Sequence, residues 1–210
     1  GKLDQAGLVG FRHVPCIQTI GADATARLAS QTVPWHIRVM NSELTPTAQL
    51  PSAPMPFNMA GYVLQHAARL GDKTALEIVS ANADGDAIWT YKQLERAVLG
   101  VATGLMQHGL KPGDRVLLRL GNTIDFPLGF LGAIAAGLVP IPSSSQLTHA
   151  EITRMASLVS PSLIIADPAV ALPDPAPCAV IDTQTLHQFT DLPPAPYHLG
   201  DPERPAYVIF

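Results

Sequence analysis

The sequence predicts an α/β protein in which helices flank a largely parallel sheet, with a β-hairpin ahead of that sheet. Two observations predict this fold class. From Tyr91 onward, helical patterns alternate with short apolar segments, which is typical of parallel strands joined by helical crossovers. The short segments are apolar at consecutive positions and not at every second one, which indicates strands that are covered on both faces.

The composition is that of a globular protein. Of the 210 residues, 47% are hydrophobic and 14% are charged, which excludes a disordered chain. The net charge is −4 and there is no block of Lys or Arg, so the sequence lacks the basic cluster that is typical of nucleic-acid binding. The most apolar stretch, 126–141, is too short to span a bilayer, and residues 1–10 lack the pattern of a signal peptide. We therefore expect a cytoplasmic protein with no membrane span and no nucleic-acid partner.

The chain is predicted to have two regions. Residues 1–56 show weak periodicity and end in a proline-rich stretch over 45–56, so we interpret them as an N-terminal extension and linker. Residues 57–210 carry the regular helical and strand patterns and are predicted to form the folded domain.

The predicted domain begins with a helix over residues 59–70, which ends at Gly71. The inner face of this helix is expected to hold four side chains: Tyr62, Val63, Ala67 and Leu70. Strands over 74–79 and 87–90 follow, and the turn-forming residues 82–86 between them predict a hairpin.

Two capping boxes predict where the next amphipathic helices begin. Thr90 with Gln93, and Thr148 with Glu151, have the spacing at which each side chain bonds the other residue's backbone N–H. The helix after Thr90 carries an apolar stripe at steps of four, three and four: Leu94, Val98, Val101 and Leu105. The helix after Thr148 is expected to extend to about Val159.

A third helix is predicted to be buried, because it is apolar nearly all round, and to be capped by Asn122. Its apolar residues are Phe126, Leu128, Phe130, Leu131 and Ile134. A helical turn or two is also expected over 183–188. Five short strands complete the pattern, at 116–120, 138–141, 163–166, 179–181 and 206–210. The last strand is apolar on both faces, and ligands in α/β sheets bind beyond the carboxyl ends of strands, so we expect the chain to stop where a site begins.

Four stretches form an ordered series: residues 89–94 with the helix after them, 109–116, 132–142 and 147–152. In this order they resemble the first two sequence motifs of the adenylate-forming superfamily, which includes acyl- and aryl-CoA synthetases, nonribosomal adenylation domains and firefly luciferase. The resemblance covers roughly residues 57–210. It implies that these residues are the N-terminal part of an AMP-binding domain, within the large N-terminal domain of an acyl-CoA synthetase-like fold.

The resemblance also implies where the chemistry lies. Residues 201–210 look like the lead-in to the family's phosphate-binding loop, and neither that loop nor the later motifs for adenine, ribose and Mg²⁺ are in this sequence. The parent enzyme is therefore expected to use ATP, Mg²⁺ and CoA, with none of them bound by this chain. No residue is assigned a catalytic, cofactor-binding or metal-ligating role, and the 210-residue chain alone is expected to be inactive.

The implied activity is ATP-dependent ligation of a small carboxylic acid, from fatty acid or aromatic acid metabolism, to CoA through an acyl-adenylate. Residues 139–145 lack the acidic residue found in nonribosomal adenylation domains, and Leu138 stands where those domains usually have Tyr. This difference favours the carboxylate–CoA ligase. Two alternatives stay open: a nonribosomal-type adenylation domain, and a natural non-catalytic interaction module.

Several residues have two interpretations. Residues 143–145, three serines after a strand, are either a polar loop or a phosphate cradle. Gly100 and Gly104 are expected to serve helix packing and not dinucleotide binding, because they lie within a helix. Surface or capping roles are expected for the histidines. Neither His13 with Cys16 nor the distant Cys178 is accompanied by the further residues that a metal site needs. Self-association through the edge or an apolar face of the sheet is also expected.

Overall fold

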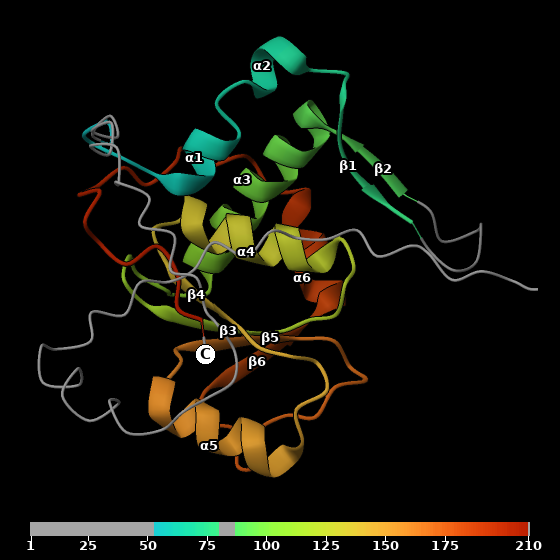
Figure 1. Ribbon diagram of the computed structural model, residues 1–210, viewed down its shortest axis with the longest axis vertical. Helices are drawn as coiled ribbons and strands as arrows, with labels where there is room; N and C mark the ends of the chain where they lie inside the picture. Colours follow the sequence, from blue (N-terminus) through green and yellow to red (C-terminus); the bar gives the residue numbers. More distant parts are fainter. Residues whose placement is uncertain (1–52, 80–86, 210) are drawn as a thin grey trace, which may run out of the picture. The chain divides into compact units, whose positions relative to one another are not determined.

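A four-stranded parallel sheet forms the centre of the fold (Figure 1). The computed structural model describes residues 53–79 and 87–209, so most of the extension predicted for 1–56, with His13 and Cys16, lies outside the described residues. The strands of the sheet are β3 (Arg115–Arg119), β4 (Val139–Pro142), β5 (Leu163–Ala166) and β6 (Ala179–Asp182). Their order is β4-β3-β5-β6, and every neighbouring pair is parallel, which confirms the predicted fold class.

Helices cover both faces of this sheet (Figure 1). Three lie on one face and one on the other: α3 (Tyr91–Gln107), α4 (Asp125–Ala135) and α6 (Thr183–Thr190), opposite α5 (His149–Val159). Alternate side chains of β3 serve the two faces, because Val116 and Leu118 pack with the three-helix side while Leu117 packs with Ile152 of α5. The consecutive apolar residues of the strand therefore reflect burial on both sides.

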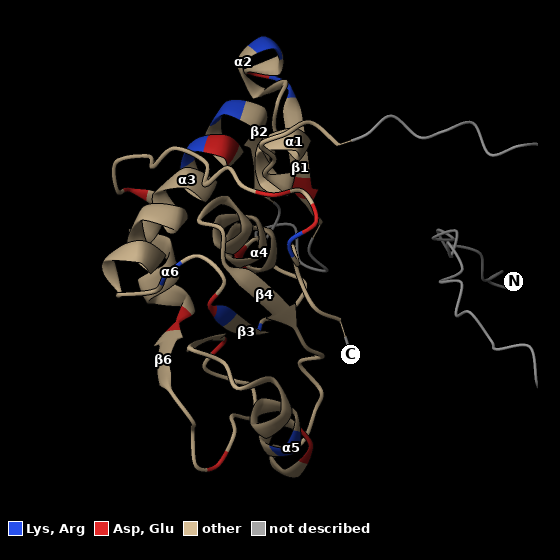
Figure 2. Ribbon diagram, turned by 90° about the vertical axis from the view of Figure 1, so that its left-hand side faces the viewer, with Lys and Arg blue, Asp and Glu red and all other residues tan. Residues whose placement is uncertain are grey.

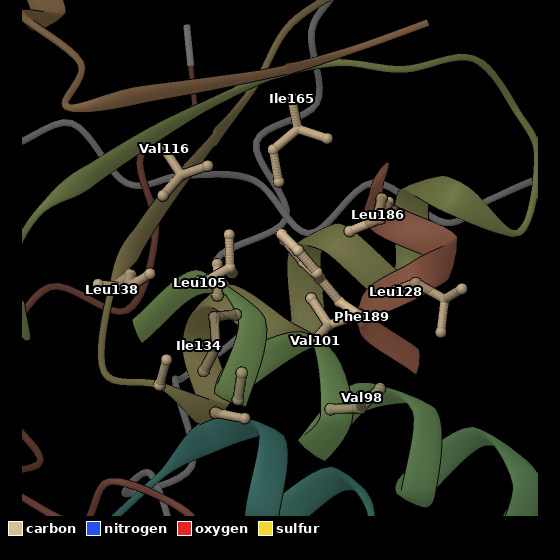
Figure 3. Close-up of a cluster of buried hydrophobic side chains, with 14 of the residues drawn as sticks. Val98, Val101, Leu105, Val116, Leu128, Ile134, Leu138, Ile165, Leu186 and Phe189 are labelled. Atoms are coloured by element: carbon tan, nitrogen blue, oxygen red, sulfur yellow. The ribbon is translucent and has the colours of Figure 1, made fainter. Parts of the chain in front are cut away.

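The larger core lies between α3, α4, α6 and the sheet (Figure 3). The four residues of the predicted stripe on α3, from Leu94 to Leu105, are all buried. Figure 3 shows how side chains from several elements meet there: Val101 and Leu105 of α3, Leu128 and Ile134 of α4, Leu186 and Phe189 of α6, and Val116 and Ile165 of the sheet. Burial of this apolar surface is the main stabilising contribution to the domain.

The helix predicted over 59–70 is two short helices, α1 (Met59–Val63) and α2 (Ala67–Leu70), with a turn between them. Ala67 is buried as expected, but Tyr62 and Val63 are 55% and 54% exposed, and Leu64 is buried instead. The buried face is set by Asn58, whose side-chain amide donates to backbone carbonyls of distant segments, Ile134 O at 2.8 Å and His198 O at 2.9 Å. A tertiary contact of this kind leaves no periodic signal in the sequence.

The predicted hairpin is present. Strands β1 (Thr74–Ile78) and β2 (Ala87–Thr90) pair in antiparallel fashion, with Glu77 opposite Ile88. The turn predicted over 82–86 lies outside the described residues.

Both predicted capping boxes are confirmed, whereas the predicted cap of α4 is wrong. Ile124 occupies the N-cap position of α4 without a side-chain hydrogen bond, and Asn122 is exposed two residues earlier. Pro127 explains the shift. A proline lacks an N–H and is tolerated only in the first turn of a helix, where that N–H would have no helical partner. Because α4 begins at Asp125, Pro127 lies within its first turn. A helix capped by Asn122 would place Pro127 in its second turn.

The capping box of α5 predicts a specific pH dependence of stability. The Glu151 carboxylate accepts from the Thr148 backbone N–H at 2.9 Å and from its hydroxyl at 2.8 Å, and these bonds lower the pKa of Glu151 below its ordinary value of 4.5. A lowered folded-state pKa means that the stabilisation is present above pH 4.5 and is lost as the pH falls through the folded-state pKa.

The variant Glu151→Gln keeps the acceptor oxygen but cannot titrate. We expect the free energy of unfolding of this variant to fall less on acidification than that of the wild-type chain, as measured by urea unfolding between pH 7 and pH 3. Equal acid sensitivity of the two chains would contradict a lowered pKa for Glu151.

Glycines in α3 allow α6 to approach closely. A Cβ on Gly100 would lie 2.6 Å from the backbone oxygen of Phe189, and one on Gly104 would lie 2.2 Å from the ring of Phe189. Gly132 of α4 is equally tight, because its Cβ would lie 2.4 Å from Val101 of α3. The glycines of α3 therefore serve helix packing, as predicted.

The strand predicted over 206–210 is not formed within the described part of that range, 206–209. The Val208 N–H donates to Pro140 O of β4 at 3.1 Å, which places this segment beside the β4 edge. Tyr207 and Ile209 are 42% and 69% exposed, while Val208 packs against the α5 side of the core. The Tyr207 ring lies against the ring of Phe130 of α4 at a centroid distance of 5.5 Å, but it is not buried, so the prediction of burial on both faces is wrong for these residues. No helix in the described ranges has the length and apolar character needed to cross a membrane.

Candidate functional site

The strand order identifies the position in the sheet where a ligand site is expected. The chain passes from β3 to the edge strand β4 through α4 on one face, and returns to β5 through α5 on the other. The segment after β5 packs on the α5 side through Val170 and Leu172, so the loops after β3 and β5 leave toward opposite faces. In open α/β sheets, the crevice beyond the carboxyl ends of two such strands is the usual binding position.

Arg119 is the last residue of β3 and lies at this position, opposite Ala166 of β5. The residue is fully buried, with 0% exposed surface. Its guanidinium donates to the Ala171 carbonyl through Nε at 3.0 Å and Nη2 at 2.9 Å, and to the Leu147 carbonyl at 3.2 Å. It also donates to the carbonyls of Ser144 and Ser145. One side chain therefore joins the loops that follow β4 and β5.

The charge of Arg119 is balanced by carbonyl dipoles. Among the residues that the structure describes, no carboxylate lies within 4.0 Å of its guanidinium nitrogens. Burial lowers the pKa of Arg119, but an arginine stays protonated at neutral pH. A buried cation without a carboxylate is unusual and is stable only when its donors are satisfied. Arg119 therefore holds together the loops after β4 and β5 at the carboxyl edge of the sheet.

Sequence reasoning missed Arg119. The signal was present, because Arg119 is the one charged residue in the strand predicted over 116–120 and lies two positions after the buried Leu117. A residue at that position must point into the same side of the core as Leu117.

The serine loop over 143–145 is built around Arg119. The Ser143 hydroxyl donates to Leu118 O at 2.9 Å and accepts from Arg119 at 3.4 Å, so it is not free to bind a ligand. Beside the loop lies a cavity of about 320 Å³. Its lining comes from the segments after β3 and β4: Leu120, Gly121, Asn122, Phe126, Ser143, Ser144, Ser145 and Gln146. Neither the polar-loop nor the cradle interpretation is complete, since Ser143 is structural while Ser144 and Ser145 line a cavity.

A second polar pair lies at the start of α4 and was also missed from the sequence. Asp125 is 8% exposed, and its Oδ1 lies 2.6 Å from Nε2 of His187 on α6. Its Oδ2 accepts from the Thr123 hydroxyl at 2.7 Å. This pair links two helices on the same face of the sheet. In the part of the chain that the structure describes, no three His, Cys, Asp or Glu residues are grouped to hold a metal ion.

The other predicted histidine roles are confirmed where they are described. His66 and His108 are exposed residues at helix ends, and Nδ1 of His108 lies 3.1 Å from Gly104 O. His149 is exposed at the start of α5. Positive and negative residues are interspersed along α3 and spread over the described chain (Figure 2). This distribution gives no basic stripe in residues 53–79 and 87–209 on which a nucleic acid would lie.

Comparison with known proteins identifies the family. The sequence profile of the AMP-binding enzyme family matches residues 63–210. The chain belongs to this family. Enterobactin synthase component E of Escherichia coli (strain K12) is 32% identical over 89 residues, which are 42% of this chain and 17% of that protein. The chain spans 11% to 21% of the length of such curated relatives.

Solved structures of AMP-binding enzymes share the fold. A benzoate CoA ligase from Burkholderia xenovorans LB400 matches 72% of this chain and 32% of its own, with a TM-score of 0.63 and 28% identity. An artificially fused adenylation–PCP di-domain of a nonribosomal peptide synthetase from Klebsiella oxytoca matches 73% of this chain and 28% of its own, with a TM-score of 0.64. Its 20% identity supports the shared fold alone. The resemblance drawn from the sequence motifs is confirmed.

Proposed function

We propose that this chain is part of an ATP-dependent carboxylate–CoA ligase. In such an enzyme the carboxylate attacks the α-phosphate of Mg·ATP, which forms an acyl-adenylate and releases pyrophosphate. The thiolate of CoA then attacks the acyl carbon, which forms the acyl-CoA thioester and releases AMP. Membership of the AMP-binding enzyme family supports the first step, and the choice of CoA as acceptor rests on Leu138 and Ser143.

The segment that leads into β4 and its loop carries the proposal. Leu138 is 2% exposed and belongs to the apolar core, at the position where nonribosomal adenylation domains usually have Tyr. A tyrosine hydroxyl there would need a buried hydrogen-bond partner. After β4, the Ser143 hydroxyl takes a backbone bond in place of the acidic residue of that group. The similarity to a benzoate CoA ligase supports the same choice.

Within that enzyme, we propose that residues 57–210 supply scaffold and not catalytic groups, and that residues 1–56 are an extension. The buried Arg119 and the Asp125–His187 pair hold loops and helices together, and no residue is assigned a reacting role. The 210-residue chain alone is accordingly expected to show no carboxylate-dependent exchange of pyrophosphate into ATP. Robust exchange by the purified chain would overturn this assignment.

The test of the ligase proposal uses the longest gene product that contains this chain. Carboxylate-dependent ATP–pyrophosphate exchange is measured first, with aromatic and medium-chain acids, and thioester formation is then compared with CoA and with a carrier protein. We expect exchange followed by acyl-CoA formation. Transfer to the carrier protein alone would favour an adenylation domain, and a complete lack of exchange would favour a non-catalytic module.

Self-association stays a prediction and has a simple test. Leu158 of α5 is 68% exposed and lines an apolar cavity of about 550 Å³ beside the β4 edge, together with Val139, Ile141 and Val208. We expect light scattering to show dimers or larger species as the concentration of the chain rises, and the variant Leu158→Asp to weaken this association. A monomer at every concentration would contradict the prediction. The cytoplasmic location also stays a prediction.

A further inference from the structure

We propose that the cavity between the loops after β3 and β4 binds a phosphate group through the backbone N–H groups of Ser144 and Ser145. The proposal concerns the 210-residue chain and does not depend on whether the whole enzyme uses CoA. It rests on the way that Arg119 orients the backbone of the loop beneath the cavity.

Arg119 turns the carbonyls of the serine loop inward. The Ser144 carbonyl accepts from Nη1, and the carbonyls of Ser145 and Leu147 accept from Nη2. In a trans peptide unit, the N–H points opposite to the C=O of the preceding residue. The inward Ser144 carbonyl therefore directs the Ser145 N–H away from Arg119. This N–H and the neighbouring N–H of Ser144, which also donates to no other atom within the described ranges, are two backbone donors of the kind that suits an anion.

The donors needed for such a site are available. Neither the Ser144 N–H nor the Ser145 N–H donates a hydrogen bond to another atom within the described ranges, whereas the Ser143 N–H is bonded to Leu118 O at 3.1 Å. Ser144, Ser145 and the exposed side chain of Asn122 line the cavity, whose volume of about 320 Å³ accommodates a phosphate group. Backbone donors of this kind are paired in folded proteins by protein, water or ligand.

The local charge also favours an anion. The Arg119 cation has no carboxylate within 4.0 Å among the described residues, and its field is weakly screened because it is buried. Phosphate suits these donors because it offers several acceptor oxygens to N–H groups on one side.

The test is a titration of the ¹⁵N-labelled chain followed by ¹H–¹⁵N NMR, with inorganic phosphate, pyrophosphate and AMP as separate probes. We expect saturable shifts of the Ser144 and Ser145 amide signals with phosphate and pyrophosphate. A higher affinity for AMP would identify a nucleotide phosphate as the ligand, and an equal or lower one would identify free phosphate or pyrophosphate.

Two surface variants with the same change in net charge make the test specific. Gln146→Glu places a negative charge at the cavity and is expected to weaken binding by about tenfold or more. Gln65→Glu lies in the exposed turn between α1 and α2 and is expected to leave the affinity unchanged. The proposal is overturned if these two amide signals do not respond, or if the two variants weaken binding equally.

Discussion

The variant Gly104→Ala is expected to lower the free energy of unfolding by about 2–3 kcal/mol, because it overpacks the contact between α3 and α6. The added Cβ would lie 2.2 Å from Cγ of Phe189, far inside van der Waals contact. The Phe189 ring is 7% exposed and lies against the His108 ring at a centroid distance of 5.0 Å, so it has little room to move. Alanine is favoured over glycine within a helix by about 1 kcal/mol, and the steric cost exceeds this gain. Urea unfolding of both chains measures the difference.

Two further variants test whether this loss comes from overpacking. Gly121→Ala adds a methyl group where no heavy atom lies within 4 Å, and its effect on stability is expected to stay within about 0.5 kcal/mol. Phe189→Leu reduces the clash, so the double variant with Gly104→Ala should be more stable than the sum of the single effects allows. If Gly104→Ala were as stable as the wild-type chain, the close approach of α3 and α6 would be wrong.

Most of the fold could be predicted because its signals are local. The capping boxes at Thr90 and Thr148 involve residues three positions apart, and both are formed. Strand β5 and strand β2 have the predicted bounds, since each is a short apolar run bordered by turn or capping residues. The errors arise where a distant group decides the local structure. Asn58 sets the buried face of α1 through carbonyls 76 and 140 positions away.

The candidate site was harder to predict for a related physical reason. The partners of Arg119 lie 24 to 52 positions further along the chain, and nearly all of them are backbone carbonyls. Every residue carries a backbone carbonyl, so the residue type does not indicate which carbonyls accept from a buried arginine. Asp125 and His187 are likewise brought together only by the packing of α4 against α6. The charged residue at the end of β3 was visible in the sequence, but the groups that satisfy it follow from the topology.

Replacement of Arg119 with Met has the second large expected effect, and two opposing terms decide its sign. The variant removes the cost of burying a charge, which alone would favour it. It also leaves the carbonyls of Leu147 and Ala171, which belong to half-buried residues, without these donors, at a cost of up to about 1–3 kcal/mol for each carbonyl that water does not reach. Because several carbonyls lose one shared donor, the cost of these lost hydrogen bonds exceeds the gain from removing the buried charge. We expect the free energy of unfolding to fall by about 3 kcal/mol.

Two matched variants show whether this loss comes from the fork of donors or from the charge. Arg119→Lys keeps the charge but has three donors in place of five, so about half of the loss is expected. Arg154→Met changes an exposed residue of α5 and should alter stability by less than about 0.5 kcal/mol. Hydrogen exchange at Leu147 should quicken in Arg119→Met before the domain as a whole unfolds, because the loop loses the side chain that holds it. Wild-type stability in Arg119→Met would mean that the desolvation of the buried cation balances all of its hydrogen bonds.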